Sequence, residues 1–99
     1  MNELEEFKKL PSWIKEMEDG SYEITIKNKK YIMQERDGSI IERCTKLSEK
    51  GIGSLEILLA RESLVDPKMT DEEFSALKGS IYMKLKVAVA YVYGLNDFF

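Results

Sequence analysis

The sequence predicts an α+β fold that is mainly α, with an N-terminal β-hairpin followed by about four helices and preceded by a short helical arm. Apolar and polar residues alternate over residues 21–36, the period of a half-buried strand. After Asp37 the apolar residues recur at helical spacing instead. Because a length of 99 residues suits one domain, we expect an arm at residues 1–20 and a single globular domain at 21–99.

The arm is expected to be helical in two pieces. Asn2 is a candidate cap for a short helix that Pro11 ends. Residues 12–17 are expected to add a further helical turn before Asp19-Gly20. Trp13, the only tryptophan of the chain, is expected to pack this arm onto the core.

The hairpin is expected at residues 21–36. Its first strand is built on Tyr22, Ile24 and Ile26, and Asn28-Lys29 is the expected two-residue turn because asparagine tolerates positive φ. A lone hairpin is marginal in water. Its apolar face therefore needs helices, or strands from a second copy of the chain, to cover it.

Four helices are expected after the hairpin, at about residues 39–50, 54–64, 71–78 and 80–93. Ser39 with Glu42 and Thr70 with Glu73 have the spacing of capping boxes. The second helix is expected to stop at Pro67, since a proline disfavours a helical residue before it. The last helix is apolar on several sides, which predicts burial on more than one side.

The residue types present exclude most catalytic chemistry. The chain has no histidine and one cysteine, which removes the commonest general base, the usual zinc ligand sets and the Ser-His-Asp and Cys-His nucleophiles. The acidic run 71–73 fits a helix start better than a calcium loop. Two carboxylates can meet in space, as in glycosidases, but the sequence selects no pair. We therefore expect no enzyme, no cofactor and no metal site.

The charge pattern argues against nucleic acid and membrane partners. Fifteen basic and eighteen acidic residues give a net charge of −3, whereas DNA affinity needs a basic face. A helix-turn-helix is also disfavoured, because six residues (65–70) separate the two helices and acids open the second one. The longest apolar stretch, residues 87–93, is too short to span a membrane. With an acidic N-terminus and no possible disulfide within the chain, we expect a cytoplasmic protein.

The C-terminal part of the chain carries more apolar residues than we expect one small core to cover. Leu95, Phe98 and Phe99 follow the last helix, and Trp13 and Tyr93 add aromatic surface. Two interpretations stay open. Either this surface marks an interaction site, or the tail folds back onto the core.

The order of elements also carries a family resemblance. Its residues are the strand end Tyr31-Ile32-Met33-Gln34-Glu35-Arg36, a helix starting near Asp37, Leu58-Leu59-Ala60-Arg61, Asp66-Pro67-Lys68-Met69-Thr70-Asp71-Glu72-Glu73-Phe74, and the closing Gly94-Leu95-Asn96. In these features residues 22–99 resemble the small tail assembly chaperones of long-tailed bacteriophages and prophages. Residues 1–20 have no counterpart in that family.

The resemblance implies a non-enzymatic chaperone in the host cell cytoplasm that binds the tape-measure protein during tail assembly, with the tail tube protein as a second candidate partner. Such a chaperone needs an apolar groove between helices. The predicted groove residues are Leu58, Leu59, Phe74, Ile81, Leu85, Val92, Leu95 and Phe98. The resemblance and the free hairpin edge also predict self-association into a homo-oligomer.

Two other functions remain open at this point. The first alternative is a small regulatory or adaptor protein that docks on a host or phage enzyme through the same apolar surface. The second is a DNA-binding repressor, which would show salt-sensitive DNA binding. A long reading frame downstream and a tail-tube gene upstream would favour the chaperone, whereas a neighbouring regulator would favour the adaptor.

Overall fold

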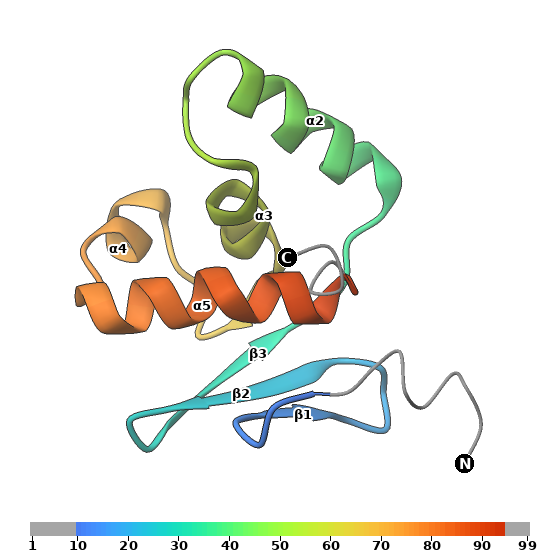
Figure 1. Cartoon of the computed structure of the whole chain (residues 1–99), viewed down its shortest axis with the longest axis vertical. Helices are drawn as coiled ribbons and strands as arrows, with labels where there is room; N and C mark the ends of the chain where they lie inside the picture. The colour runs from blue at the N-terminus through green and yellow to red at the C-terminus, as the bar shows by residue number, and fades with distance from the viewer. Residues whose placement is uncertain (1–9, 95–99) are drawn as a thin grey trace.

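The computed structural model describes residues 10–94, which form a four-stranded antiparallel sheet and four helices (Figure 1). The sheet order follows the chain, β1-β2-β3-β4. In chain order the elements are β1 (Ile14–Glu16), β2 (Tyr22–Ile26), β3 (Lys29–Met33), α2 (Gly38–Glu49), α3 (Leu55–Ser63), β4 (Leu64–Asp66), α4 (Asp71–Ser75) and α5 (Gly79–Val92).

The predicted architecture, a mainly α fold with a lone two-stranded hairpin, is wrong because the hairpin lies inside a wider sheet. The turn predicted as helical at residues 12–17 is replaced by β1, in which Ile14 pairs with Ile24 of β2. The expected end of the second helix is β4, where Leu64 pairs with Met33 of β3. Three-residue strands show no period of their own, so only these distant pairings define them. The helix predicted to begin at Asn2 lies outside the described residues.

The hairpin itself forms, with its turn one residue earlier than predicted. Lys27 and Asn28 have φ values of 49° and 67°, and Ile26 pairs with Lys29. Positive φ at both central residues suits the right-handed twist of a hairpin. The predicted turn would have kept the same apolar residues on the same face, so alternation along the strands could not choose between the two registers.

The four helices begin and end close to the predicted positions, except that α4 stops after five residues. Ser54 caps α3, and Thr70 with Glu73 forms the predicted capping box of α4. The prediction that Ser39 caps α2 is wrong, because the Asp37 carboxylate accepts hydrogen bonds from the backbone N–H groups of Ser39 and Ile40. Aspartate is as good a cap as serine. Because α2 begins at Gly38, Asp37 occupies the N-cap position and Ser39 lies within the first turn.

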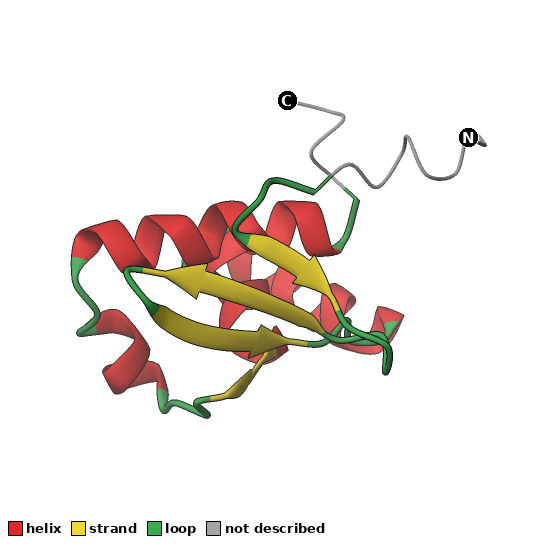
Figure 2. Ribbon diagram, turned by 90° about the horizontal axis from the view of Figure 1, so that it is seen from below, coloured by secondary structure: helices red, strands yellow, loops and turns green. Residues whose placement is uncertain are grey.

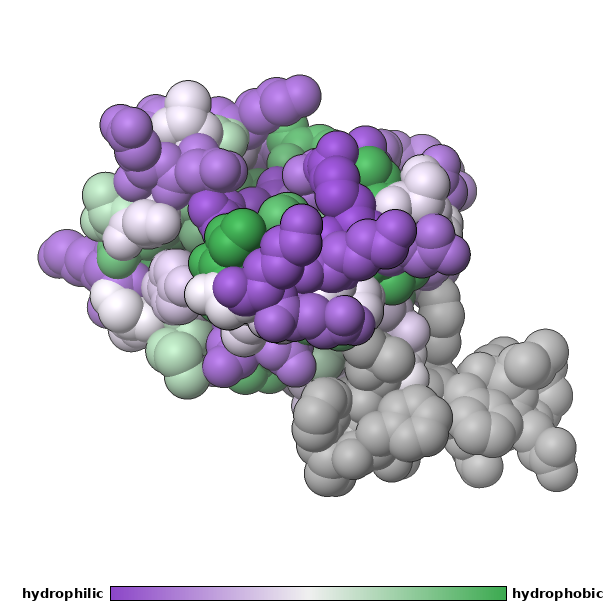
Figure 3. Space-filling model, turned by 90° about the horizontal axis from the view of Figure 1, so that it is seen from above, coloured by the Kyte–Doolittle hydropathy of each residue, from purple (hydrophilic) through white to green (hydrophobic). Residues whose placement is uncertain are grey.

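The sheet has one buried face and one open face. The inward residues of the strands, among them Ile24, Tyr31 and Met33, are almost fully buried. The outward residues are mainly polar, and Lys30 on this face pairs with Glu23 at 3.6 Å. Figure 2 shows this open face with no helix across it. Seen from the opposite side, the molecule is covered mostly by hydrophilic residues, with small separate apolar patches (Figure 3).

Helix α5 covers the buried face of the sheet. It contacts β2 on one side and α3 on the other, and α2 packs on α3 farther from the sheet (Figure 1). The hairpin strands β2 and β3 are both flanked by other strands, so the hairpin edge predicted to drive self-association is already occupied. The two outer strands are only three residues long, and short edges of this kind offer little backbone to another chain.

A polar network joins the ends of three elements. The Tyr93 hydroxyl, just after α5, accepts the Arg36 N–H at 2.8 Å and lies 2.7 Å from the Ser63 hydroxyl. The Ser63 carbonyl, at the end of α3, accepts the Gln34 N–H at 2.9 Å. Ser63 is completely buried. The network therefore fixes the end of α5 to both α3 and the segment that follows β3.

The same junction carries an ionic contact. The Arg36 guanidinium donates to the Glu62 carbonyl at 2.8 Å, and it lies 3.5 Å from the carboxylate of the same residue. Arg43 of α2 contacts the other carboxylate oxygen of Glu62. Because these side chains are partly exposed, solvent screens the charges. The contact therefore helps to fix the relative orientation of α2 and α3 and contributes little to the free energy of folding.

We predict that Tyr93→Phe lowers the free energy of unfolding by about 1–3 kcal/mol, because the buried Ser63 hydroxyl and the Arg36 N–H lose their shared partner. Urea denaturation followed by circular dichroism measures the change. Tyr82→Phe is the matched control, since its ring packs against Phe74, and it should change stability by less than about 0.5 kcal/mol. Equal effects of the two substitutions would show that the Tyr93 hydroxyl contributes nothing.

We also predict an acid-sensitive contribution from Asp37. The Ser39 hydroxyl, together with the Ile40 N–H, holds the pKa of the Asp37 carboxyl below its usual value of 3.8. The folded chain thus favours the carboxylate. Its stabilisation is present above the unfolded pKa and is lost as the pH falls through the folded pKa.

The urea midpoint of the wild type should therefore fall further between pH 6 and pH 2.5 than that of Asp37→Asn. Ser39→Ala, which removes the main cause of the pKa shift, should reduce the same pH dependence. An identical pH dependence in the wild type and Asp37→Asn would contradict this assignment.

Candidate functional site

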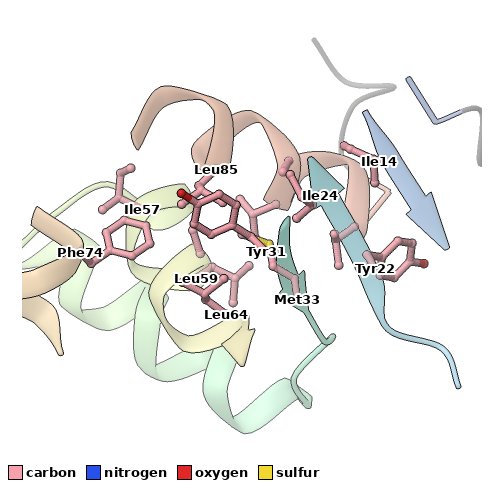
Figure 4. Packing of buried hydrophobic residues seen from close by; sticks show 14 of the residues in the cluster. Ile14, Tyr22, Ile24, Tyr31, Met33, Ile57, Leu59, Leu64, Phe74 and Leu85 are labelled. Carbon is pink, nitrogen blue, oxygen red and sulfur yellow. The ribbon is translucent and has the colours of Figure 1, made fainter. Parts of the chain in front are cut away.

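The predicted groove residues lie mainly in the hydrophobic core. Five of them are buried, and Ile81 is partly buried. The five buried residues are Leu58, Leu59, Phe74, Leu85 and Val92. Leu95 and Phe98 lie outside the described residues. Figure 4 shows Leu59, Phe74 and Leu85 within the same packed cluster as Tyr31 and Met33 of the sheet. In this fold the five buried side chains offer no surface to a partner.

The opposite side of α5 does offer apolar surface. Met83 is 53% exposed and Val87 is 43% exposed. They are four residues apart and so lie on one face of the helix. In the rest of the described chain only Ile52 and Val65 are comparably exposed large apolar residues. Ile52 belongs to the loop between α2 and α3, and Val65 belongs to β4.

Two lysines border this apolar line. We call Met83 and Val87, together with Lys84 and Lys86, the outer ridge of α5. All the charged residues of Gly79–Val92 are lysines. The ion pairs observed between described residues involve other side chains, so neither ridge lysine has a carboxylate partner within residues 10–94.

Trp13 supports one side of the ridge. Its ring packs at an edge-to-face angle on Tyr91, with centroids 6.5 Å apart, and the Lys84 ammonium lies 4.6 Å from the centre of the indole. The prediction that Trp13 packs on the core is confirmed. The tryptophan also holds a lysine of α5 through a cation–π contact, which the sequence did not indicate.

Other candidate groups are accounted for by local structure. Cys44 is buried, and this burial raises the pKa of its thiol, which disfavours the reactive thiolate. A depression of about 540 Å³ lies beside β1 and the turn after it, and Met17, Asp19 and Ile32 contribute to its lining. The Asp19 carboxylate there is bound by the hydroxyl and N–H of Ser21, at 2.6 and 2.9 Å. Within residues 10–94, no three acidic, histidine or cysteine side chains gather as metal ligands would.

Comparison with known protein families, with curated proteins and with solved structures returned no match. The likeness to tail assembly chaperones therefore stays a prediction from the sequence. Over the described part of the chain, no helix combines the length and the apolar character that crossing a membrane requires.

Sequence reasoning missed the outer ridge although a signal was present. The last helix is apolar on nearly every side, so the sequence pattern predicted burial for the helix and did not separate its exposed apolar residues from its buried ones. Around the helix axis, Lys84 and Lys86 lie on either side of Met83 and Val87. The positions of these two lysines indicate which side of an otherwise apolar helix faces solvent, because lysines are almost never fully buried unless paired.

We predict that two truncations on α5 separate core from surface. Leu85→Ala should lower the free energy of unfolding by about 2–5 kcal/mol, since it leaves a cavity beneath the sheet. Met83→Ala, two residues away on the exposed side, should change it by about 0.5 kcal/mol or less. Both variants gain the same good helix former, so the comparison isolates burial. Urea denaturation measures both changes. A small effect of Leu85→Ala would contradict the burial of Leu85 and would favour its predicted role as a surface residue.

Proposed function

We propose that this protein is a non-enzymatic binding protein that holds an amphipathic helix of another protein, in the manner of a phage tail assembly chaperone with its tape-measure protein. The observation that carries the proposal is the outer ridge of α5. The tape-measure protein enters through the sequence resemblance alone.

The ridge suits a helical partner because its own helix is fixed. The inner side of α5, including Leu85, Val89 and Val92, is fully buried, and the Tyr93 network holds its end. Binding to a surface that is already ordered costs less conformational entropy than binding to a loop. Side chains four apart also form the row that inserts into the groove of a second helix.

The size of the ridge favours a reversible complex. Two exposed apolar side chains and two lysine stems cover far less than the roughly 800 Å² per partner of a standard stable interface. Weak binding of this kind fits a chaperone that must release its client when the tail tube forms. It also fits a regulatory or adaptor protein docking on an enzyme, which is the alternative function that uses the same ridge.

The test first asks whether tail genes neighbour this protein's gene, and then co-expresses the protein with helical fragments of the tape-measure protein that they encode. We expect the wild type to raise the soluble amount of a fragment and to co-purify with it. The double variant Met83→Ser/Val87→Ser should raise the Kd about tenfold, as expected for the loss of roughly 1.4 kcal/mol of apolar contact, and should recover less fragment.

Ile52→Ser is the matched control, because Ile52 is 59% exposed but lies on a different element. This variant should recover as much fragment as the wild type. Fragments that stay insoluble with the wild type, or that are recovered equally with the double variant, would overturn the proposal. A gene neighbourhood without tail genes would instead favour the adaptor.

A further inference from the structure

We infer that the outer ridge of α5 binds an amphipathic helix whose apolar stripe is bordered by carboxylates on both sides. The inference rests on the proposed function, in that it takes the ridge to bind a helix, and it specifies the chemistry of that helix.

The first support is the local charge. The chain as a whole has a net charge of −3, yet the charged residues of α5 are all lysines. The cations paired with carboxylates in the described chain are Lys30 and three arginines. The ridge lysines, Lys84 and Lys86, share their lack of a described partner with other lysines, but they are the ones that flank exposed apolar side chains of one helix. Within residues 10–94, no carboxylate neutralises these two charges, so the carboxylates of a partner can pair with them.

The second support is the arrangement of these charges around the helix. With 3.6 residues per turn, each residue advances by about 100°. Met83 and Val87 then lie about 40° apart, and the two lysines lie about 80° to either side of the line midway between them. A helix packed along this line, at an axial distance of about 8–10 Å, places the side chains beside its own apolar stripe next to the two ammonium groups.

The third support is that both lysines are held on their sides of the ridge. Trp13 lies under the Lys84 ammonium at 4.6 Å, so this charge is positioned before a partner arrives. Lys86 is half-buried and follows Tyr82 by one turn, on the side where Tyr82 contacts Phe74 of α4. Because Lys86 is partly buried, neighbouring residues cover part of its side chain.

Other occupants fit this surface less well. Duplex DNA binding grows with the number of neutralised phosphates, and two lysines on an acidic chain neutralise few. A bilayer surface calls for a broad apolar face with a strongly charged border, whereas this ridge has two exposed apolar side chains. A helix with flanking carboxylates matches both the width of the ridge and the sign of its charges.

The test uses two synthetic 18-residue helical peptides with the same leucine stripe. One peptide carries glutamate at both borders of the stripe, and the other carries lysine at the same positions. A dye at the peptide terminus reports binding by anisotropy at 50 and 300 mM NaCl. We expect the glutamate peptide to bind at least tenfold more tightly than the lysine peptide at 50 mM NaCl. The preference should shrink at 300 mM, because salt screens exposed charges.

Charge-removing variants locate the effect. Lys84→Gln/Lys86→Gln should weaken binding of the glutamate peptide about tenfold and abolish the preference between the two peptides. Lys46→Gln/Lys50→Gln removes the same charge from the exposed lysines at the end of α2 and should bind as the wild type does. Circular dichroism establishes that both variants keep their fold.

Equal binding of the two peptides, unchanged binding by Lys84→Gln/Lys86→Gln, or complete competition by an 18-base-pair DNA duplex would each overturn the inference. Its failure is distinguishable from failure of the proposed function. If Met83→Ser/Val87→Ser loses the tape-measure fragment while Lys84→Gln/Lys86→Gln keeps it, the function stands and the charge rule fails. If the glutamate peptide binds as expected but no fragment is recovered, the ridge chemistry stands and the tape-measure assignment fails.

Discussion

The structure depends on covering one face of a four-stranded sheet. Inward side chains from all four strands, such as Ile14, Ile24, Tyr31 and Leu64, are buried on this face, and together they represent apolar surface that water would otherwise solvate at high cost. Helix α5 supplies most of the cover, and α3 and α2 then pack outward from it (Figure 1). Because the other face of the sheet is polar, the molecule has a single core on one side of the sheet.

This requirement explains why the last helix is apolar on most of its sides. One side of α5 meets the sheet, and a second side meets α3. Only a narrow strip remains for solvent, and on that strip Met83 and Val87 lie between two lysines. The hydrogen bonds of the Tyr93 hydroxyl with Ser63 and Arg36 fix the end of α5 relative to α3, which apolar contacts alone would not do.

The functional proposal follows from the same arrangement. Helix α5 lies between the sheet and α3, so its exposed side belongs to an element that is already packed, and binding by the partner that we propose would cost little ordering of this surface. The lysines give the ridge a sign opposite to that of the whole chain. In the complex that we propose, this surface would select its partner by charge at its borders and by shape along its centre.

The sequence by itself determined the elements whose signal is local. The hairpin, the positions of α2, α3 and α5 and the caps at Ser54 and Thr70 follow from periodicity and side-chain capping within a few residues. The absence of histidine likewise removed whole classes of chemistry from consideration. Tertiary structure decided everything that depends on distant pairing. The strands β1 and β4 exist because Ile14 meets Ile24 and Leu64 meets Met33, and three residues are too few to show a pattern alone. The split of α5 into core and ridge was also decided there, since an apolar residue on a helix becomes buried or exposed only when its neighbours are in place.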